Sequence, residues 1–247
     1  MLLPTGVRPA LADCEDAAAI GPLIGGADAV VHLAGITAWQ GLARSPGIDR
    51  PRALVAVSSA GIYSRHRTSV AAYRAGEEAL RAANARTAII RPTMIYGSIR
   101  DRNVHHVIGL ARRYGVLPLI GDGTARIQPI HFRDLAAAVA ALIDVGRPVT
   151  VDAGGGAPVS LREAGEAIFR CLGRQARFLP VPYGVALASA RALDRFRGTR
   201  WGERVERMIE DRTVDNTRLV ETTGTRPRLF AEGLRDELVA LGLAAAA

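Results

Sequence analysis

The stretch between residues 54 and 97 constrains the fold of this chain more than any other. It holds two buried-strand patterns, at residues 54–57 and 87–90, and small or hydroxyl-bearing residues follow each of them closely. Continuous apolar runs of this length are typical of parallel strands that are covered on both faces. Ligands of such sheets bind just beyond the carboxyl ends of the strands. The stretch therefore predicts an α/β fold with a parallel sheet, and a site at the carboxyl edge of that sheet.

The basic residues exclude several kinds of catalytic and binding site. The chain has a formal net charge of +8, and all 32 of its basic residues are arginine, because the sequence contains no lysine. A Schiff-base lysine and a Walker A lysine are therefore excluded. The arginines are scattered, and they form no stripe that alternates with aromatic residues, so we expect no nucleic-acid partner. The charge favours a surface that attracts anionic small molecules.

The sequence also disfavours a membrane-spanning, secreted or metal-binding protein. No apolar run is long enough to span a bilayer, and the first residues do not show the pattern of a signal peptide. Cys14 and Cys171 lie far apart, as expected for reduced thiols in a cytoplasmic protein. His105 and His106 are adjacent and point to different helical faces, and we predict no metal site. We expect a cytoplasmic protein that has no membrane partner.

Hydrophobic periodicity and turn signals predict the other elements. Ser160 and Glu163 have the spacing of a capping box at the start of a helix, and Gly173 suits its end. Strands are expected at residues 7–11, 29–35, 116–120 and 149–152, and further helices at 16–23, 103–114, 134–145, 183–196, 202–210 and 230–241.

Three segments of the central stretch carry a resemblance to a known family. They read LVAVSSAGIYS from residue 54, SVAAYRAGEEALRAA from residue 69 and TAIIRPTMIYG from residue 87. Together they resemble the extended short-chain dehydrogenase/reductases, in particular the NAD-dependent epimerase/dehydratase group. The run PLIGDG…QPIHFRDLA extends the resemblance toward the C-terminus. In that family a Ser or Thr, a Tyr, and a Lys four residues after the Tyr reduce or oxidise a carbonyl against a nicotinamide cofactor.

This resemblance implies an N-terminally incomplete Rossmann-like domain over residues 1–147 and a small, mainly helical substrate lobe over residues 148–247. It implies NAD or NADP as cofactor, a nucleotide-sugar or other small carbonyl or hydroxyl substrate, and allows a homodimer. The implied catalytic residues are Ser59 and Tyr73. The implied cofactor contacts are Asp13, Leu33, Ala34, Gly35, Pro92 and Thr93.

The sequence departs from the family pattern at two points. It contains no G-x-x-G-x-x-G turn between a strand and a helix, which is the turn that holds the pyrophosphate of a dinucleotide. The residue four positions after Tyr73 is Glu77, and a carboxylate there would raise the phenol pKa, against the needs of proton transfer. An alternative alignment places Tyr73 at the lysine position and Ser69 at the tyrosine position.

Two functions therefore stay open. The first is an NAD(P)-dependent epimerase, dehydratase or reductase relative in which Ser59 hydrogen-bonds the substrate. The second is a non-catalytic family member that binds a nucleotide or a partner protein. The role of Ser59 is open as well, because a serine at a strand end also caps the following turn.

Overall fold

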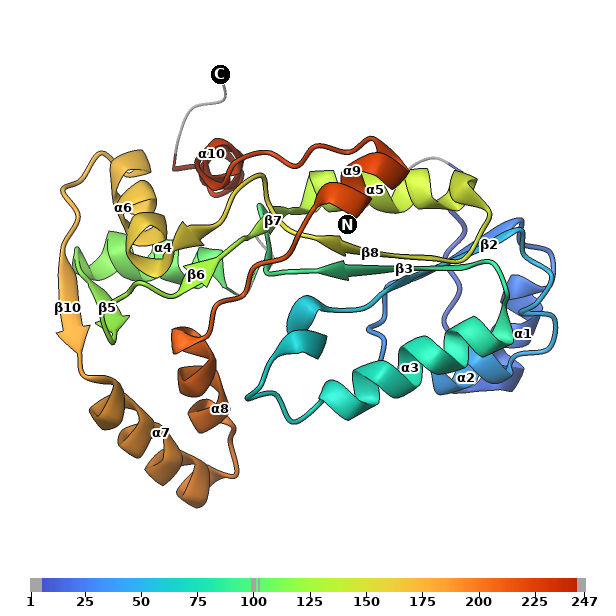
Figure 1. Ribbon diagram of the computed structural model, residues 1–247, viewed down its shortest axis with the longest axis horizontal. Coiled ribbons are helices and arrows are strands. Elements are labelled where there is room, and N and C mark those ends of the chain that lie inside the picture. Colours follow the sequence, from blue (N-terminus) through green and yellow to red (C-terminus); the bar gives the residue numbers. More distant parts are fainter. Residues whose placement is uncertain (1–5, 99–100, 102, 244–247) are drawn as a thin grey trace.

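A four-stranded parallel sheet forms the centre of the molecule. The computed structural model describes residues 6–98, 101 and 103–243. Every neighbouring pair of strands in this sheet is parallel, and β2 and β3 lie in the middle. The predicted α/β fold is therefore confirmed (Figure 1). The strand order is β1 (Ala29–His32), β2 (Ala53–Val57), β3 (Thr87–Pro92) and β8 (Val149–Ala153).

Helices cover both faces of this sheet, which explains why its middle strands are apolar on both sides. One face carries α1 (Ala17–Ile24), α2 (Gln40–Arg44) and α3 (Val70–Ala83). The other face carries α5 (Phe132–Val145) and α9 (Thr217–Thr223) (Figure 1). The side chains of β2 and β3 are consequently packed between two layers of helix.

A second apolar cluster is centred on the fully buried Phe169 and lies beyond the carboxyl edge of the sheet. The predicted capping box is confirmed at its edge, because Ser160 Oγ accepts from the Glu163 backbone N–H and Glu163 accepts from that of Ser160. The elements of this region are α4 (Val104–Tyr114), β5 (Leu117–Ile120), α6 (Leu161–Cys171), β10 (Phe178–Val181) and α10 (Phe230–Ala240).

The chain passes between these two regions more than once. Strand β8 follows residue 147 but pairs with β3 in the central sheet, whereas β5 precedes it and pairs with β10. The boundary predicted at residue 147 thus does not coincide with the edge of the sheet. Short strands connect the regions: β4 (Ile95–Tyr96) pairs with β7 (Ile130–His131), and β6 (Arg126–Ile127) pairs with β9 (Val159–Ser160).

A helical hairpin projects from the second region (Figure 1). It consists of α7 (Tyr183–Arg197) and α8 (Trp201–Glu206), and the 3-10 turn η2 (Arg207–Ile209) leads the chain back toward the sheet. None of the described helices is long and apolar enough to cross a membrane.

The local predictions differ from the structure in a few places. Residues 7–11 do not form the predicted strand. Their backbone pairs with no strand in the described part of the chain, and their side chains are exposed. Helix α9 was not predicted, since its sequence TRLVETT is rich in β-branched residues, which have low helix propensity. The fully buried Leu219 anchors it to the sheet, so tertiary packing decides its conformation.

Candidate ligand-binding site

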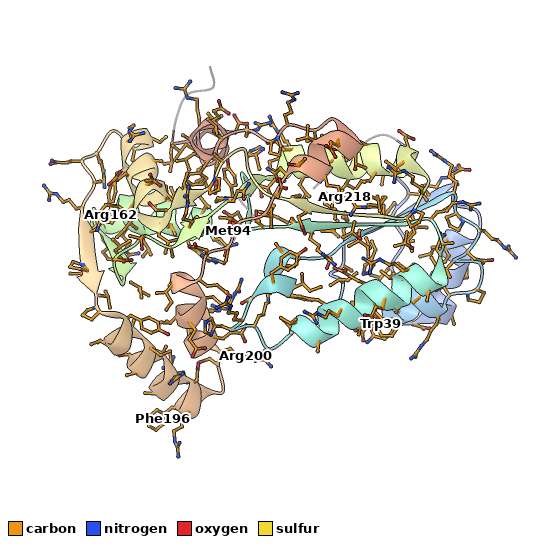
Figure 2. The ribbon with its side chains drawn as sticks, in the orientation of Figure 1. Trp39, Met94, Arg162, Phe196, Arg200 and Arg218 are labelled. Carbon is orange, nitrogen blue, oxygen red and sulfur yellow. The ribbon has the colours of Figure 1, made fainter. Side chains whose placement is uncertain are left out.

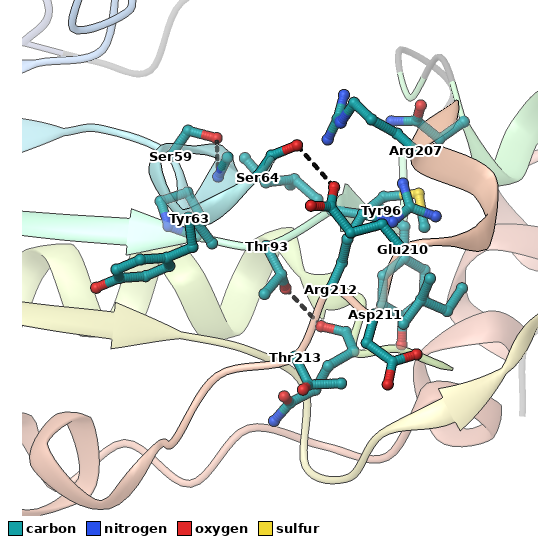
Figure 3. Close-up of a pocket in the computed structure, with 18 of the residues that line it drawn as sticks. Ser59, Tyr63, Ser64, Thr93, Tyr96, Arg207, Glu210, Asp211, Arg212 and Thr213 are labelled. Atoms are coloured by element: carbon teal, nitrogen blue, oxygen red, sulfur yellow. Dashed lines mark hydrogen bonds between the residues drawn. The ribbon is translucent and has the colours of Figure 1, made fainter. Parts of the chain in front are cut away.

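A cavity of about 520 Å³ lies at the carboxyl edge of the sheet, where the sequence pattern predicts a site. This volume lies within the usual range for small-molecule sites. The cavity is lined from both regions of the chain, and Figure 3 shows the side chains that face it. The lining residues fall in four stretches, at residues 59–67, 92–98, 127–128 and 207–213, together with Asp101 and Asn103.

Ser59 lines this cavity directly after β2. Its Oγ accepts a hydrogen bond from the backbone N–H of Gly61 at 3.0 Å, and the residue caps the short 3-10 turn η1 (Ala60–Tyr63). Ser59 therefore has the capping role that was one of its two predicted roles. Its position on the wall leaves the predicted contact with a ligand as a proposal.

Tyr63 follows Ser59 on the same wall, and its phenol is held by charged neighbours. The hydroxyl donates to the carboxylate of Asp152 at 3.0 Å and accepts from Arg91 Nη1 at 2.6 Å. Burial and the Asp152 carboxylate raise the pKa of the Tyr63 phenol, against the opposing charge of Arg91. The phenol is therefore protonated at neutral pH and is a weak acid–base group.

Tyr73 lies elsewhere, on α3, and is not among the residues that line the cavity. Its side chain is 9% exposed and packs with Ile62 and Leu80 in the cluster beneath the sheet. The guanidinium of Arg67 lies 5.0 Å from the centre of its ring. The structure thus brings Ser59 and Tyr63 to the cavity wall, whereas Tyr73 lies behind that wall, beside Ile62 and Arg67.

Glu77 is the buried acid of this region, with only 1% of its surface exposed. Ser58 Oγ donates to its carboxylate at 2.6 Å, and Arg91 donates to both carboxylate oxygens. Burial alone would raise the pKa of Glu77, but the hydrogen bonds from Arg91 and Ser58 lower it below its usual value. This network joins α3 to the carboxyl ends of β2 and β3, and sequence reasoning did not find it.

The predicted cofactor contacts fall into two groups. Pro92 and Thr93 line the cavity at the end of β3, and the Thr93 hydroxyl donates to the backbone carbonyl of Gln128. The other group lies outside the cavity lining. Leu33, Ala34 and Gly35 form an exposed turn after β1, where Gly35 has a φ of +93° that favours glycine, and Asp13 is exposed near α1.

The residues at the carboxyl edge of the sheet fit only part of a dinucleotide cofactor. The ends of β1 and β3 share the carboxyl edge, but the turn after β1 leads into α2, a helix of five residues. The glycine of that helix, Gly41, has a packing role, because a Cβ there would collide with the backbone carbonyl oxygen of Cys14. The turn after β1 therefore supplies no glycine-rich helix start for a pyrophosphate.

Three guanidinium groups face the cavity, from Arg67, Arg207 and Arg212. Segment 207–213 is placed by the backbone N–H of Arg212, which donates to the carbonyl of Arg126 at 2.7 Å. Within the described part of the chain, none of the three forms an ion pair, and the buried Nε atoms of Arg207 and Arg212 have no hydrogen-bond partner. The three guanidinium groups therefore line the cavity without a counter-ion in the described chain, although the two Nε atoms themselves are covered.

Carboxylates also line the cavity, but N–H and hydroxyl groups hold them. Glu210 accepts from the Ser64 hydroxyl at 2.6 Å and from the Arg65 backbone N–H at 2.7 Å. Asp211 accepts from the backbone N–H of Arg126, and Asp101 accepts from two backbone N–H groups. Within the described residues, none of these carboxylates forms an ion pair with Arg67, Arg207 or Arg212.

The charges on these arginines are unfavourable in the folded chain. Burial and the neighbouring charge of Arg207 lower the pKa of Arg212 to about 10, although Glu210 opposes the shift. Burial and the charge of Arg67 likewise lower the pKa of Arg207. An anion between these groups would relieve both penalties, because an opposite charge favours the ionised form.

Sequence reasoning missed Arg207 and Arg212. They belong to the run ERVERMIEDR, in which alternating charges are typical of a solvent-exposed helix face. Only the tertiary structure distinguishes these two arginines, because it places them in the same cavity as residues 59–67, which are distant in the sequence.

Comparisons with known proteins match parts of this chain to two curated relatives. No family model matches the sequence. The chain is 35% identical over 123 residues to the mitochondrial NADH dehydrogenase [ubiquinone] 1 alpha subcomplex subunit 9 of Arabidopsis thaliana, which covers 49% of this chain and 30% of that protein. It is 42% identical over 71 residues to the ceramide reductase of Caulobacter vibrioides, and this match covers 29% of this chain and 22% of that protein. Each match thus spans less than a third of the relative.

Solved structures match over most of the chain. A putative epimerase from Burkholderia cenocepacia has a TM-score of 0.69 at 21% identity, over 98% of this chain and 89% of that one. The UDP-glucuronic acid 4-epimerase from Bacillus cereus, solved in complex with NAD, has a TM-score of 0.68 at 13% identity, over 90% and 77%. The predicted resemblance is thereby confirmed at the level of the fold, and the chain has the Rossmann-like fold of the NAD-dependent epimerases and dehydratases.

Proposed function

We propose that this chain binds an anionic nucleotide ligand in the cavity, and that it does not perform the Tyr–Lys proton transfer implied by the resemblance. The observation that carries the proposal is the set of three guanidinium groups that line one cavity and form no ion pair in the described chain. Charge-assisted hydrogen bonds from arginine to phosphate or carboxylate are among the strongest polar contacts in proteins.

The phenols support a binding role. Proton transfer by a tyrosine at neutral pH needs a lowered phenol pKa, which a nearby ammonium group normally provides. This chain has no lysine, and Tyr73 does not line the cavity. The two phenols that line the cavity, those of Tyr63 and Tyr96, both have a raised pKa. The lining therefore supplies anion-binding groups, but no phenol whose pKa is lowered for proton transfer.

The relatives fit the same proposal. Several structural neighbours were solved with NAD or NADPH, and one relative is by name a subunit of an NADH dehydrogenase, which is consistent with a ligand-binding subunit as well as with an enzyme. NAD or NADP is accordingly the first ligand to test, with the nicotinamide end against Ser59, Pro92 and Thr93, as the resemblance implies. A nucleotide-sugar such as UDP-glucuronic acid is the second.

Isothermal titration calorimetry of the purified chain tests this proposal. The titrants are NADH, NADPH, UDP-glucuronic acid, ADP and inorganic phosphate. We expect saturable binding of at least one nucleotide, weakened about tenfold or more by Arg207→Gln or Arg212→Gln, because each change removes a charge-assisted hydrogen bond. The control is Arg112→Gln, an exposed arginine on α4. Absence of binding by every titrant, or equal loss in the control, contradicts the proposal.

A second candidate is a reductase-like activity that uses Ser59 and Tyr63. It is favoured by the shared wall of these two residues and by the 2.6 Å contact between Arg91 and the phenol. Oxidation of NADH in the presence of a carbonyl substrate, lost in Tyr63→Phe and retained in Tyr73→Phe, would identify this activity. No turnover with the wild-type chain would exclude it for the substrates tested.

A further inference from the structure

Helix α7 presents an apolar stripe away from the body of the molecule. Val185, Ala188, Ala192 and Phe196 recur at the spacing that places side chains on one helical face, and all four are exposed. Phe196 is 85% exposed and Val185 is 59% exposed. Figure 2 shows Phe196 at the outer end of the hairpin, pointing away from the other elements. None of these residues lines the cavity.

A second aromatic residue lies close to this end of the hairpin. Trp201 is the first residue of α8 and is 45% exposed, and the guanidinium of Arg204 lies 4.6 Å from the centre of its ring. Only four residues separate Trp201 from Phe196, so both rings lie at the turn between the two helices. We call Phe196, Trp201 and the neighbouring Arg195, Arg197 and Arg200 the hairpin tip.

The hairpin tip is positively charged. Arg195, Arg197 and Arg200 form no ion pair in the part of the chain that the structure describes. The acidic residues of the hairpin are already engaged. Asp194 accepts from Thr199 and from the backbone N–H groups that open α8, Glu203 accepts from Thr68, and Glu206 pairs with Arg191 at 2.7 Å.

We propose that the hairpin tip docks on the surface of a bilayer that contains anionic lipids, in contrast to the expectation from the sequence that the protein has no membrane partner. A helix with an exposed apolar stripe, aromatic residues at one end and arginines beside them has the composition of an interfacial membrane contact. The aromatic rings would lie at the level of the headgroups, and the arginines would contact lipid phosphates. The stripe itself would rest on the boundary between headgroups and acyl chains.

Other partners fit this surface less well. A nucleic acid would use the arginines and stack on the aromatic rings, but the aliphatic residues Val185, Ala188 and Ala192 would have no role in that contact. A second copy of this chain would bring two positively charged tips together, and like charges repel. The combination of an aliphatic stripe with unpaired arginines is therefore best satisfied by an anionic lipid surface.

Co-sedimentation with lipid vesicles tests the proposal on the whole chain. The probes are vesicles of phosphatidylcholine alone and of phosphatidylcholine with phosphatidylglycerol. We expect binding to the anionic vesicles that weakens as salt is added. The double variant Arg195→Gln/Arg197→Gln should bind about 25-fold more weakly, because each arginine near an anionic surface contributes about fivefold. The double variant Phe196→Ala/Trp201→Ala should lose about tenfold, because it removes the apolar anchors.

A matched control lies on α4. Tyr114 is 62% exposed and stacks with Arg113, so Arg112→Gln/Arg113→Gln and Tyr114→Ala change the same residue types at a different surface. These controls should bind vesicles like the wild type, and thermal melts should show that all variants are folded. The proposal is overturned by equal binding to neutral vesicles, by no binding, or by losses that match the controls. It is also overturned if single-stranded DNA binds with the same dependence on the tip, or if the tip variants dissociate a dimer.

Discussion

Arg91 and Glu77 form a bidentate ion pair beneath the carboxyl edge of the sheet, with Arg91 Nε and Nη2 at 2.8 and 2.6 Å from the two carboxylate oxygens. The Glu77 side chain is 2% exposed and that of Arg91 is 17% exposed. The same guanidinium donates to Tyr63 on the cavity wall. One arginine thus joins the packing of α3 to the wall of the candidate site.

Removing one partner of this pair should be strongly destabilising. Arg91→Met leaves the Glu77 carboxylate buried without its main counter-charge, and we expect the free energy of unfolding to fall by about 3–5 kcal/mol. Urea denaturation of the purified variant measures this loss.

The exposed pair of Arg52 and Asp144, at 3.4 Å, provides the matched control. Its side chains are 58% and 79% exposed, so Arg52→Met should change the free energy of unfolding by less than about 1 kcal/mol. Equal losses in the two variants would show that the buried pair contributes no more than a surface contact.

Glu237 should make stability depend on pH. Its side chain is fully buried on α10, and burial together with the charge of Asp101 raises its pKa to about 7. An acid whose pKa is higher in the folded chain binds more protons there, so stability falls as pH rises from the unfolded pKa toward 7. We expect a loss of up to about 3 kcal/mol across this window.

Unfolding free energies measured between pH 5 and pH 8 test this sign. Glu237→Gln should flatten the pH dependence and stabilise the chain at pH 8, because the replacement carries no charge to bury. Glu78→Gln, at an exposed position of α3, should keep the wild-type slope. A wild-type stability that does not fall as pH rises, or a Glu237→Gln variant that keeps the wild-type slope, would contradict the assignment.

Tyr73 should behave as a packing residue. Tyr73→Ala removes a buried ring from the cluster around Leu80 and is expected to cost about 3–5 kcal/mol of stability. Tyr73→Phe keeps the ring and should leave nucleotide affinity, measured by calorimetry, unchanged within about twofold. If Tyr73→Phe instead abolished a measurable turnover, packing alone would not explain Tyr73, and its predicted catalytic role would be supported.

The sequence predicts the sheet and most helices because their signals are local. The apolar runs of β2 and β3, and the Ser160–Glu163 capping box, can be recognised from residues near one another in the chain. Helix α9 could not be predicted in this way, because the burial of Leu219 decides its conformation.

The candidate site is predictable only on its sheet side. Ser59, Pro92 and Thr93 follow the predicted strands and line the cavity. Arg207 and Arg212 reach the same cavity through the path of the chain after α8, which depends on tertiary packing. Their run of alternating charges is typical of a solvated face, so nothing local separates these two arginines from the rest.

The most direct test of the central claim compares melting temperatures of the wild type and Arg212→Gln with and without nucleotide. The buried charge of Arg212, whose pKa is lowered to about 10, costs at most about 3 kcal/mol without a ligand. Arg212→Gln should therefore melt a few degrees higher than the wild type in buffer. Saturating NADH or UDP-glucuronic acid should reverse this order, because the wild type binds more tightly. A variant that melts lower in buffer and gains as much from the ligand as the wild type would contradict an anion-binding role for this arginine.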